Sequence, residues 1–419
     1  MRMRRRGNWR AGFAERFGKF NVILKQSITN RQVLWMHAVS VGEVNLCTQL
    51  IRGLEPRMPN LKIVVSTTTT TGMGELKKKL PSHVSRIYYP LDLRKYVSRA
   101  LSALYPEAII LVEAEIWPNF IWRAADMGIP VFLVNARLSD KSYRRYKRFG
   151  FLFRPIFASF AGVGVQNEAD AQRLIDLGCR PEVVRSVGNL KFDAAELETR
   201  TNVSVANMLK QVGVPKDARV LLAASTHDGE EAILGEIFLR LRKQFPDLFL
   251  VVVPRHAERG RDVGRDLKNK GVKFVYRSDI GLKTQLQPGE VDCLVVNSTG
   301  ELKLFYDLAT VVFVGKSLTS HGGQTPIEPA AVGKPVVFGP NMQNFADVVR
   351  EFLSKGGAVQ VQNAAELEKK LAELLGNESQ RAELGQKAVR VVRENLGAID
   401  RTVDMIVQRL DNGEIYIKK

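Results

Sequence analysis

Carboxylates follow apolar runs at two places in the first half of the chain. Glu43 comes shortly after the run Val33–Ala38, and Glu113 and Glu115 come directly after Ala108–Val112. A carboxylate at such a junction can take a proton from a hydroxyl group, or it can simply complement the positive end of a helix. For Glu43 the residue type alone favours the helix-end interpretation. Glu113 and Glu115 stand two residues apart and point to opposite faces, so one can face a ligand while the other anchors a neighbouring loop.

Small and hydroxyl residues stand at the same kind of junction. Ser40 and Gly42 precede Glu43, and a run of threonines that includes Thr70 follows the apolar stretch Leu61–Ser66. Gly42 is expected to permit a tight turn. The hydroxyl groups can hydrogen bond to a phosphate or a sugar, and they are equally suited to cap the following helix. The sequence leaves both roles open.

Two junctions in the second half indicate an anionic ligand. Ser225 and Thr226 end one apolar run and precede a helical pattern, which makes them a candidate phosphate site. Pro254, Arg255 and His256 follow the next run, so a fixed cation and an imidazole stand directly at a strand end. A lone histidine is more often structural, but an Arg-His pair at this position favours a ligand role.

The segment with the most candidate ligand-binding residues lies between Gly322 and Pro329. A Gly322-Gly323 turn after the run 311–314 lets the backbone approach a ligand closely, and Gln324 follows it. Pro326 suits the first position of a helix, and Glu328 then projects from the first turn. A carboxylate there can accept both ribose hydroxyls while free backbone N–H groups bind phosphate. The segment predicts a nucleotide site.

Short apolar runs bounded by Gly or Pro alternate with amphipathic stretches along the whole chain. This rhythm predicts an α/β protein with two parallel sheets, each covered by helices on both faces. The predicted strands are 33–38, 61–66, 108–112, 131–134, 162–165, 185–188, 220–224, 248–253, 293–296, 311–314 and 335–338. The predicted helices include 44–54, 168–177, 230–244, 365–375 and one long final helix over 377–410.

The best domain boundary falls between Phe192 and Asp217, where a polar helical stretch and a Gly-Val-Pro segment separate the two sets of strands. We expect an N-terminal Rossmann-like domain over residues 1–205, a C-terminal Rossmann-like domain over 206–395 and a closing helix over 396–419 that packs back on the first domain. Two such domains place a ligand cleft outside the carboxyl ends of their strands.

The formal net charge of +18 on 419 residues indicates an anionic partner such as nucleic acid, an acidic membrane or a phosphorylated substrate. Basic residues cluster over 2–19 and 137–154, so we expect the anion-binding surface on the N-terminal domain. The three cysteines lie far apart in or beside apolar runs, which favours buried reduced thiols over disulfides. The sequence shows neither a signal peptide nor an uninterrupted apolar run of about 18 residues.

An aromatic pattern near the N-terminus gives the membrane hypothesis a second basis. Trp9, Phe13, Phe17, Phe20 and Leu24 recur at helical spacing, with basic residues between them. This pattern is typical of a helix that lies in a membrane surface, and it is equally compatible with a helix packed on the N-terminal sheet. Arginines among them, including Arg16, suit a phosphorylated glycolipid because guanidinium groups grip phosphate in a bidentate manner.

Together these motifs resemble the Kdo transferases, glycosyltransferases of GT-B architecture that move 3-deoxy-D-manno-octulosonic acid (Kdo) from CMP-Kdo to a lipid A precursor. The similarity runs in order through nearly the whole chain. Where the family usually has Gly-Gly-His-Asn-Pro, this chain has Gln324-Thr325 after the two glycines. The matching segments are 37–43, 66–72, 112–119, 135–138, 188–193, 225–231, 254–256, 322–331, 339–341 and 344–345.

The resemblance implies a role for each candidate residue. Glu43 is similar to the family's catalytic base, with Glu113 or Glu115 as a second essential carboxylate. The implied CMP-Kdo contacts are Ser225, Thr226, Pro254, Arg255, His256, Gly322, Gly323, Gln324, Glu328 and Asn344. The expected contacts to the lipid A precursor are Ser40, Gly42, Thr70, Arg137 and Arg16.

The expected reaction is an inverting, metal-independent transfer to lipid IVA in lipopolysaccharide core biosynthesis, with CMP-Kdo as donor substrate and no cofactor. The enzyme would act at the cytoplasmic face of the inner membrane, peripherally or through an anchor outside this chain. A transferase for another nucleotide sugar, or an epimerase, is the alternative. A nucleic-acid-binding protein is a remote one, because no reader motif is present and strand-end carboxylates would repel a phosphate backbone.

Overall fold

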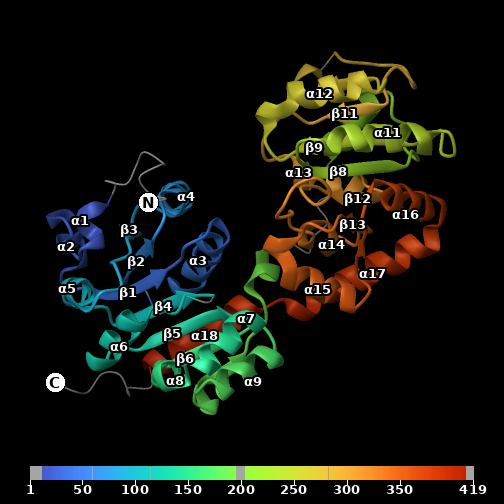
Figure 1. The fold of residues 1–419 in the computed structure, drawn as a ribbon. Helices are drawn as coiled ribbons and strands as arrows, with labels where there is room; N and C mark the ends of the chain where they lie inside the picture. The colour runs from blue at the N-terminus through green and yellow to red at the C-terminus, as the bar shows by residue number, and fades with distance from the viewer. Residues whose placement is uncertain (1–11, 59, 114, 195–202, 282, 412–419) are drawn as a thin grey trace. The chain divides into compact units, whose positions relative to one another are not determined.

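The computed structural model describes residues 12–58, 60–113, 115–194, 203–281 and 283–411 (Figure 1). Contacts divide the chain into two units. Unit 1 comprises residues 1–194 and 395–419, and unit 2 comprises residues 195–394. The basic residues of 2–10 and Trp9 lie outside the described residues.

Unit 1 is built on a sheet of seven parallel strands in the order β3-β2-β1-β4-β5-β6-β7. Its central strands are nearly all apolar because helices cover both faces of the sheet. The strands are β1 (Gln32–His37), β2 (Leu61–Thr67), β3 (Ser85–Tyr88), β4 (Ala108–Val112), β5 (Val131–Ala136), β6 (Gly162–Val165) and β7 (Val184–Ser186).

Two hydrophobic cores flank this sheet. One core takes side chains from α2, α5, α6, α8 and α9, and the other from α3, α4 and α18. The helices of unit 1 are α1 (Phe13–Arg16), α2 (Val22–Ile28), α3 (Val41–Leu54), α4 (Thr70–Lys79), α5 (Arg94–Leu104), α6 (Pro118–Asp126), α7 (Asp140–Arg148), α8 (Gly150–Ala158), α9 (Glu168–Asp176) and α18 (Ala398–Asp411).

Unit 2 repeats the plan with seven parallel strands in the order β10-β11-β9-β8-β12-β13-β14. The strands are β8 (Val220–Thr226), β9 (Phe249–Pro254), β10 (Phe274–Tyr276), β11 (Cys293–Val295), β12 (Val311–Val314), β13 (Val336–Phe338) and β14 (Val359–Gln360). The helices are α10 (Val203–Gln211), α11 (Glu230–Arg242), α12 (Gly260–Asn269), α13 (Leu302–Phe305), α14 (Ile327–Ala331), α15 (Ala346–Ser354), α16 (Ala364–Gly376) and α17 (Glu378–Asn395).

The predicted fold class is confirmed, and each predicted strand overlaps an observed one. The sequence missed β3, β10 and β14. All three lie at sheet edges and are only partly buried, so they lack the continuous apolar run that marked the other strands.

The single long helix predicted over 377–410 is wrong. The chain forms α17 and α18 instead, with Gly397 between them in the left-handed region at φ 80°. The carboxylate of Asp193 accepts hydrogen bonds from the N–H groups of Gly397 and Ile399, and so fixes the start of α18 on unit 1. Val403 of α18 then packs against Gly53 of α3.

The described part of the aromatic N-terminal pattern forms two short helices rather than one. Gly18, at φ 71°, lies between α1 and α2. Phe20 and Leu24 are buried in the core of unit 1, and Phe17 packs edge-on against Tyr96 of α5. This part of the pattern therefore packs on unit 1, which is the second of the two interpretations left open by the sequence.

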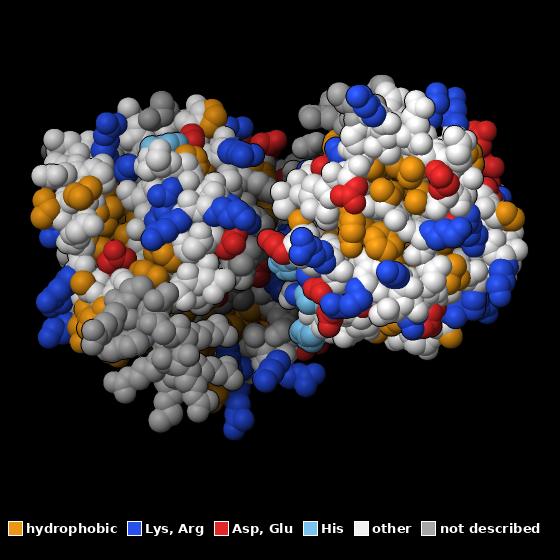
Figure 2. All heavy atoms as spheres, turned by 90° about the horizontal axis from the view of Figure 1, so that it is seen from above, with side chains coloured by type: hydrophobic (Ala, Val, Ile, Leu, Met, Phe, Trp, Pro, Cys, Tyr) orange, Lys and Arg blue, Asp and Glu red, His pale blue; other side chains and the backbone are white. Residues whose placement is uncertain are grey.

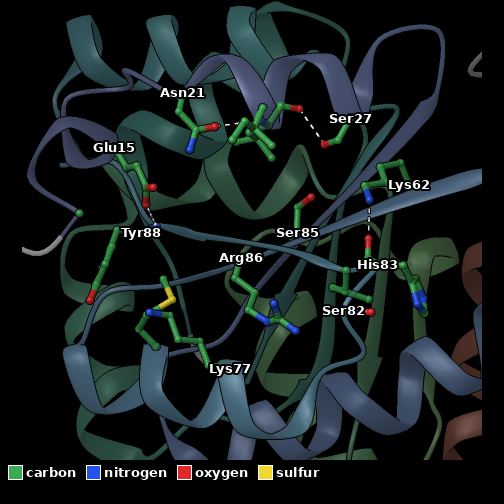
Figure 3. Close-up of a pocket in the computed structure, with 15 residues that line it drawn as sticks. Glu15, Asn21, Ser27, Lys62, Lys77, Ser82, His83, Ser85, Arg86 and Tyr88 are labelled. Atoms are coloured by element: carbon green, nitrogen blue, oxygen red, sulfur yellow. Dashed lines mark hydrogen bonds between the residues drawn. The ribbon is translucent and has the colours of Figure 1, made fainter.

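A cavity of about 560 Å³ opens along β3, between α2 and α4 (Figure 3). Lys62, Lys77 and Arg86 line it, as does Glu15, whose carboxylate accepts a hydrogen bond from the Tyr88 N–H. The Arg86 guanidinium donates to three backbone carbonyls around the end of α4, and Lys62 donates to another. Two of the three cations thus serve to hold the fold at this edge.

Candidate functional site

Glu43, Glu113 and Glu115 come together at the carboxyl ends of β1 and β4, which are neighbours in the sheet. Glu43 and Glu113 both contribute to raising the pKa of Glu115. Carboxylates that disfavour one another's ionisation in this way are typical of sites that move protons.

Glu43 is buried in the first turn of α3. Its carboxylate accepts a hydrogen bond from the Val39 N–H at 2.7 Å, and its own N–H donates to the Ser40 hydroxyl at 3.2 Å. This reciprocal pair is helix capping, so the role favoured by residue type is present. Burial is nevertheless the dominant influence and raises the pKa of Glu43. One carboxylate thus caps the helix and has a raised pKa.

Glu113 is held in a strained backbone conformation. Its φ of 62° lies in the left-handed region, which costs a residue with a side chain about 1–2 kcal/mol. The carboxylate lies 3.3 Å from the Lys191 ammonium and 3.9 Å from the Arg137 guanidinium. Lys191 was not among the predicted site residues, although it lies within the matched segment 188–193.

Glu115 lies in a more apolar setting. Its carboxylate accepts a hydrogen bond from the Trp117 indole at 2.8 Å and lies 3.9 Å from Nε2 of His37. Burial, together with the Glu43 carboxylate, raises the pKa of Glu115 to about 7. Of the two carboxylates after β4, Glu113 is therefore the one paired with cations and Glu115 the one close to half-protonated at neutral pH.

Two fully buried rings beside Glu115 were missed by the sequence reasoning. His37 stacks on Tyr89 with ring centroids 4.0 Å apart, and burial lowers the pKa of His37 to about 3. Within the described residues, Nε2 of His37 and the Tyr89 hydroxyl have no hydrogen-bond partner. Buried polar atoms without partners mark a site that a ligand or water completes. Only the position of His37 at a strand end pointed to it in the sequence.

The residues expected to bind an acceptor differ in their positions and contacts in the structure. Ser40 is the N-cap of α3, while Gly42 lies exposed in the helix without a left-handed φ, so the predicted tight turn is wrong there. Thr70 begins α4, whose N-cap is Thr69. Arg16 is buried, donates to the Thr68 carbonyl and covers a tyrosine ring. It positions the threonine run, and its contact with an acceptor stays a prediction.

In unit 2 the predicted donor residues meet at the ends of β8 and β9. Thr226 pairs with Pro254, and the Thr226 carbonyl accepts a hydrogen bond from the Arg255 N–H. Ser225 has a φ of 55°, while Thr226 is fully buried with a hydroxyl that has no partner among the described residues. Arg255 and His256 are exposed.

A buried carboxylate organises the neighbouring strand end. Glu230 accepts hydrogen bonds from the N–H groups of His227, Lys316, Ser317 and Leu318 at 2.7–2.9 Å. It thereby ties the start of α11 to the loop after β12. The sequence gave no reason to single out Glu230 from other helix-start carboxylates.

The Gly322-Gly323 turn packs closely against neighbouring protein segments, and its own N–H groups are already bonded. The Gly322 N–H donates to the Gln343 side chain, and the Gly323 N–H donates to the Lys316 carbonyl. Gly322 has a φ of 123°, a conformation that residues with side chains rarely adopt, so a glycine is favoured there. These two N–H groups are therefore not among the free backbone donors of the segment.

Glu328 lies in the first turn of α14, as predicted. Its carboxylate accepts a hydrogen bond from the buried Tyr306 hydroxyl at 3.3 Å and lies 3.9 Å from the Lys303 ammonium. Burial, reinforced by Glu328, raises the pKa of Tyr306, which keeps this hydroxyl a donor. Gln324 is half-buried between this helix and the glycine turn.

The positive charge is concentrated in one unit. Unit 1 has 35 Lys and Arg against 19 Asp and Glu, a net charge of +16, whereas unit 2 has 27 against 25, a net charge of +2. Figure 2 shows Lys and Arg side chains on the visible face of both units. The difference between the units thus lies in both the basic and the acidic residues, and unit 1 attracts anions more strongly.

Exposed apolar side chains are concentrated in the same unit. Among the residues that the structure describes, all of the large exposed ones except Leu353 belong to unit 1. They are Phe13, Val22, Ile23, Leu91, Leu93, Tyr105, Phe149, Phe151 and Leu152. Across the described ranges, the structure contains no helix with the length and apolar character needed to cross a bilayer.

Similarity to known structures supports the two-unit architecture. A UDP-GlcNAc 2-epimerase from Neisseria meningitidis bound to UDP-GlcNAc matches with a TM-score of 0.58 at 13% identity, covering 90% of this chain and 100% of that one. A glycosyltransferase from Rickettsia africae matches with a TM-score of 0.57 at 12% identity, covering 91% and 100%. At these identities the matches show the fold alone, which is GT-B.

Sequence similarity is more specific. Residues 11–194 match the family described as 3-deoxy-D-manno-octulosonic-acid transferase, and residues 236–391 match glycosyl transferases group 1. The 3-deoxy-D-manno-octulosonic acid transferase of Haemophilus influenzae is 32% identical over 96% of this chain and 92% of its own length. The enzyme of the same name from Bordetella pertussis is 30% identical over the same shares. The chain therefore belongs to the Kdo transferase family of GT-B glycosyltransferases.

Proposed function

We propose that this protein transfers Kdo from CMP-Kdo to a lipid A precursor, lipid IVA, with inversion at the anomeric carbon. Family membership supports the sugar that is transferred. The observation that carries the chemistry is the cluster of Glu43, Glu113 and Glu115, in which burial raises the pKa of Glu43 and of Glu115. Such carboxylates are suited to removing a proton from a sugar hydroxyl.

In the proposed reaction Glu43 is the base. The ionised carboxylate takes the proton of the acceptor hydroxyl, whose oxygen forms a bond to the anomeric carbon of Kdo. The bond from that carbon to the phosphate oxygen breaks, and CMP leaves with the electron pair. One displacement at the opposite side of the carbon inverts its configuration. Lys191 and Arg137 hold the Glu113 carboxylate beside the site through their ion pairs.

Unit 2 is proposed to hold the donor. Arg255 and His256 are exposed at the end of β9, next to Ser225 and Thr226. The positive charge of Arg255 and the hydrogen-bond donors of both side chains suit the phosphate of CMP, and Arg255 would stabilise the charge that develops on it without a metal ion. Glu328, with its oxygens facing Tyr306 and Lys303, is proposed to accept the ribose hydroxyls.

Unit 1 is proposed to meet the acceptor at the cytoplasmic surface of the inner membrane. Its net charge of +16 suits the phosphates of a lipid A precursor and anionic phospholipid headgroups. Its exposed apolar side chains, such as Val22, Ile23 and Phe151, suit the acyl region beneath them. Both features support peripheral attachment through this unit.

The test is turnover by Glu43→Gln. Glutamine keeps an oxygen that can accept the Val39 N–H, so the cap on α3 is preserved while the base is lost. We expect the rate of Kdo transfer, measured by mass spectrometry of the lipid product, to fall by about 10²–10⁴-fold. Binding of CMP by calorimetry should be unchanged. Glu182→Gln, an exposed carboxylate of unit 1, is the matched control. Turnover at the wild-type rate would remove Glu43 as the base.

A further inference from the structure

Lys316 occupies a backbone conformation that disfavours a side chain. It follows Gly315 directly after β12 and has a φ of 56°. Its N–H donates to Glu230, and its carbonyl accepts the Gly323 N–H, so the conformation is fixed from both sides. A non-glycine residue there costs about 1–2 kcal/mol. The turn itself therefore gives no reason for a lysine, and strained residues of this kind gather at functional sites.

The lysine side chain lies against the glycine turn. Its Cε is 3.6 Å from the position that a Cβ on Gly322 would take, and the Asn344 amide nitrogen is 2.7 Å from the same point. Among the described residues, the Lys316 ammonium makes no hydrogen bond or ion pair. The buried carboxylate of Glu230, which accepts the Lys316 N–H, is already satisfied by four backbone N–H groups. The positive charge is thus held beside the turn without a protein partner.

Two backbone donors follow the same turn. The N–H groups of Gly322 and Gly323 are bonded within the protein, but those of Gln324 and Thr325 make no hydrogen bond in the part of the chain that is described. An ammonium whose stem lies against this turn, together with the consecutive free N–H groups that follow it, is suited to a phosphate group. The other ionisable residues of the neighbouring loops are His227, Asp228 and His321, and among the described residues none of them is paired with Lys316.

We propose that Lys316 binds the phosphate of the nucleotide donor, together with the N–H groups of Gln324 and Thr325. This assignment rests on the proposed function, because it takes the donor to be a cytidine monophosphate sugar. It adds to unit 2 a second cation besides Arg255. It also explains the strained conformation, since the left-handed backbone directs the side chain of Lys316 past Gly322.

The experiment compares the affinities of CMP and cytidine for the full chain by calorimetry. Lys316→Met keeps the length of the stem and removes the charge. We expect CMP to bind about ten- to a hundredfold more weakly, as for loss of a charge-assisted hydrogen bond, with the affinity for cytidine unchanged. Lys316→Arg should retain most of the affinity for CMP. Lys369→Met, which removes an exposed lysine of α16 from the same unit, should bind CMP as the wild type does.

A second variant separates binding from folding. Lys316→Gly relieves the backbone strain, so its melting temperature should not fall although its affinity for CMP does. Wild-type affinity for CMP in Lys316→Met would overturn the assignment, as would equal losses for CMP and cytidine. If CMP affinity were unchanged while the KM for CMP-Kdo rose, the contact would be with the sugar carboxylate instead, which would also overturn the assignment. Failure of the wild-type chain to bind CMP would instead refute the proposed donor.

Discussion

Glu115→Gln should make unit 1 more stable, and only above about pH 5. The folded-state pKa of Glu115 is about 7 against an ordinary value of 4.5, because burial and the Glu43 carboxylate disfavour its ionisation. A raised pKa means that the folded state keeps a proton that the unfolded chain releases. The stabilisation that comes from this retained proton is therefore fully present below the unfolded-state pKa and is lost as the pH rises through 7.

The size of the effect follows from the two pKa values. One pKa unit corresponds to about 1.4 kcal/mol, so this carboxylate destabilises unit 1 by about 3 kcal/mol at alkaline pH. Between about pH 5 and pH 8 the wild type should lose about 2.5 kcal/mol that the variant keeps. For a unit of this length that is a relative shift of about 5–10 °C in melting temperature. Glutamine resembles the protonated acid and can still accept the Trp117 indole N–H.

The chain offers a selective assay, because all four tryptophans belong to unit 1: Trp9, Trp35, Trp117 and Trp122. Tryptophan fluorescence during heating therefore reports on that unit alone. Melting curves of the wild type and Glu115→Gln should nearly coincide near pH 5 and separate as the pH rises, while Glu182→Gln should follow the wild type. Parallel pH profiles for Glu115→Gln and the wild type would refute the reasoning.

Three further changes test the architecture around the sites. Glu43→Gln should move the pH-dependent loss of stability to lower pH, because the Glu43 charge that it removes raises the pKa of Glu115. A pH profile that does not move would contradict this coupling. Asp193→Ala should cost about 1–3 kcal/mol in urea unfolding followed by tryptophan fluorescence, because two N–H groups at the start of α18 lose their acceptor, and wild-type stability would contradict that role. Glu230→Ala should weaken CMP binding in calorimetry and lower the melting temperature, since four backbone N–H groups lose their acceptor; wild-type values for both would show that the loop after β12 is held by other contacts.

The central strands and the junction residues could be predicted from the sequence because both leave local signals. A strand buried on both faces reads as an apolar run, and the carboxyl end of a parallel strand is marked by the polar residue that follows it. Glu43, Glu113 and Arg255 were found in this way, and Glu328 was found from the proline at the start of its helix. The edge strands β3, β10 and β14 left no such run.

Other features depend on contacts between distant segments, which no local pattern shows. The capping of α18 by Asp193 joins residues more than 200 positions apart in the chain. Lys191 enters the site only because the segment after β7 returns to Glu113. The left-handed conformations of Glu113 and Lys316 could not be predicted either, since neither residue type favours them.

The return of α18 to unit 1 has a consequence for how the protein is made. Ile399, Val403 and Ile406 belong to the same hydrophobic core as Leu46 and Leu50, yet they are synthesised about 350 residues later. Unit 2 is complete in the growing chain before α18 emerges from the ribosome. The order of folding is then inverted relative to the order of synthesis: the unit that starts first must wait, with part of an apolar face uncovered, for the last helix to arrive.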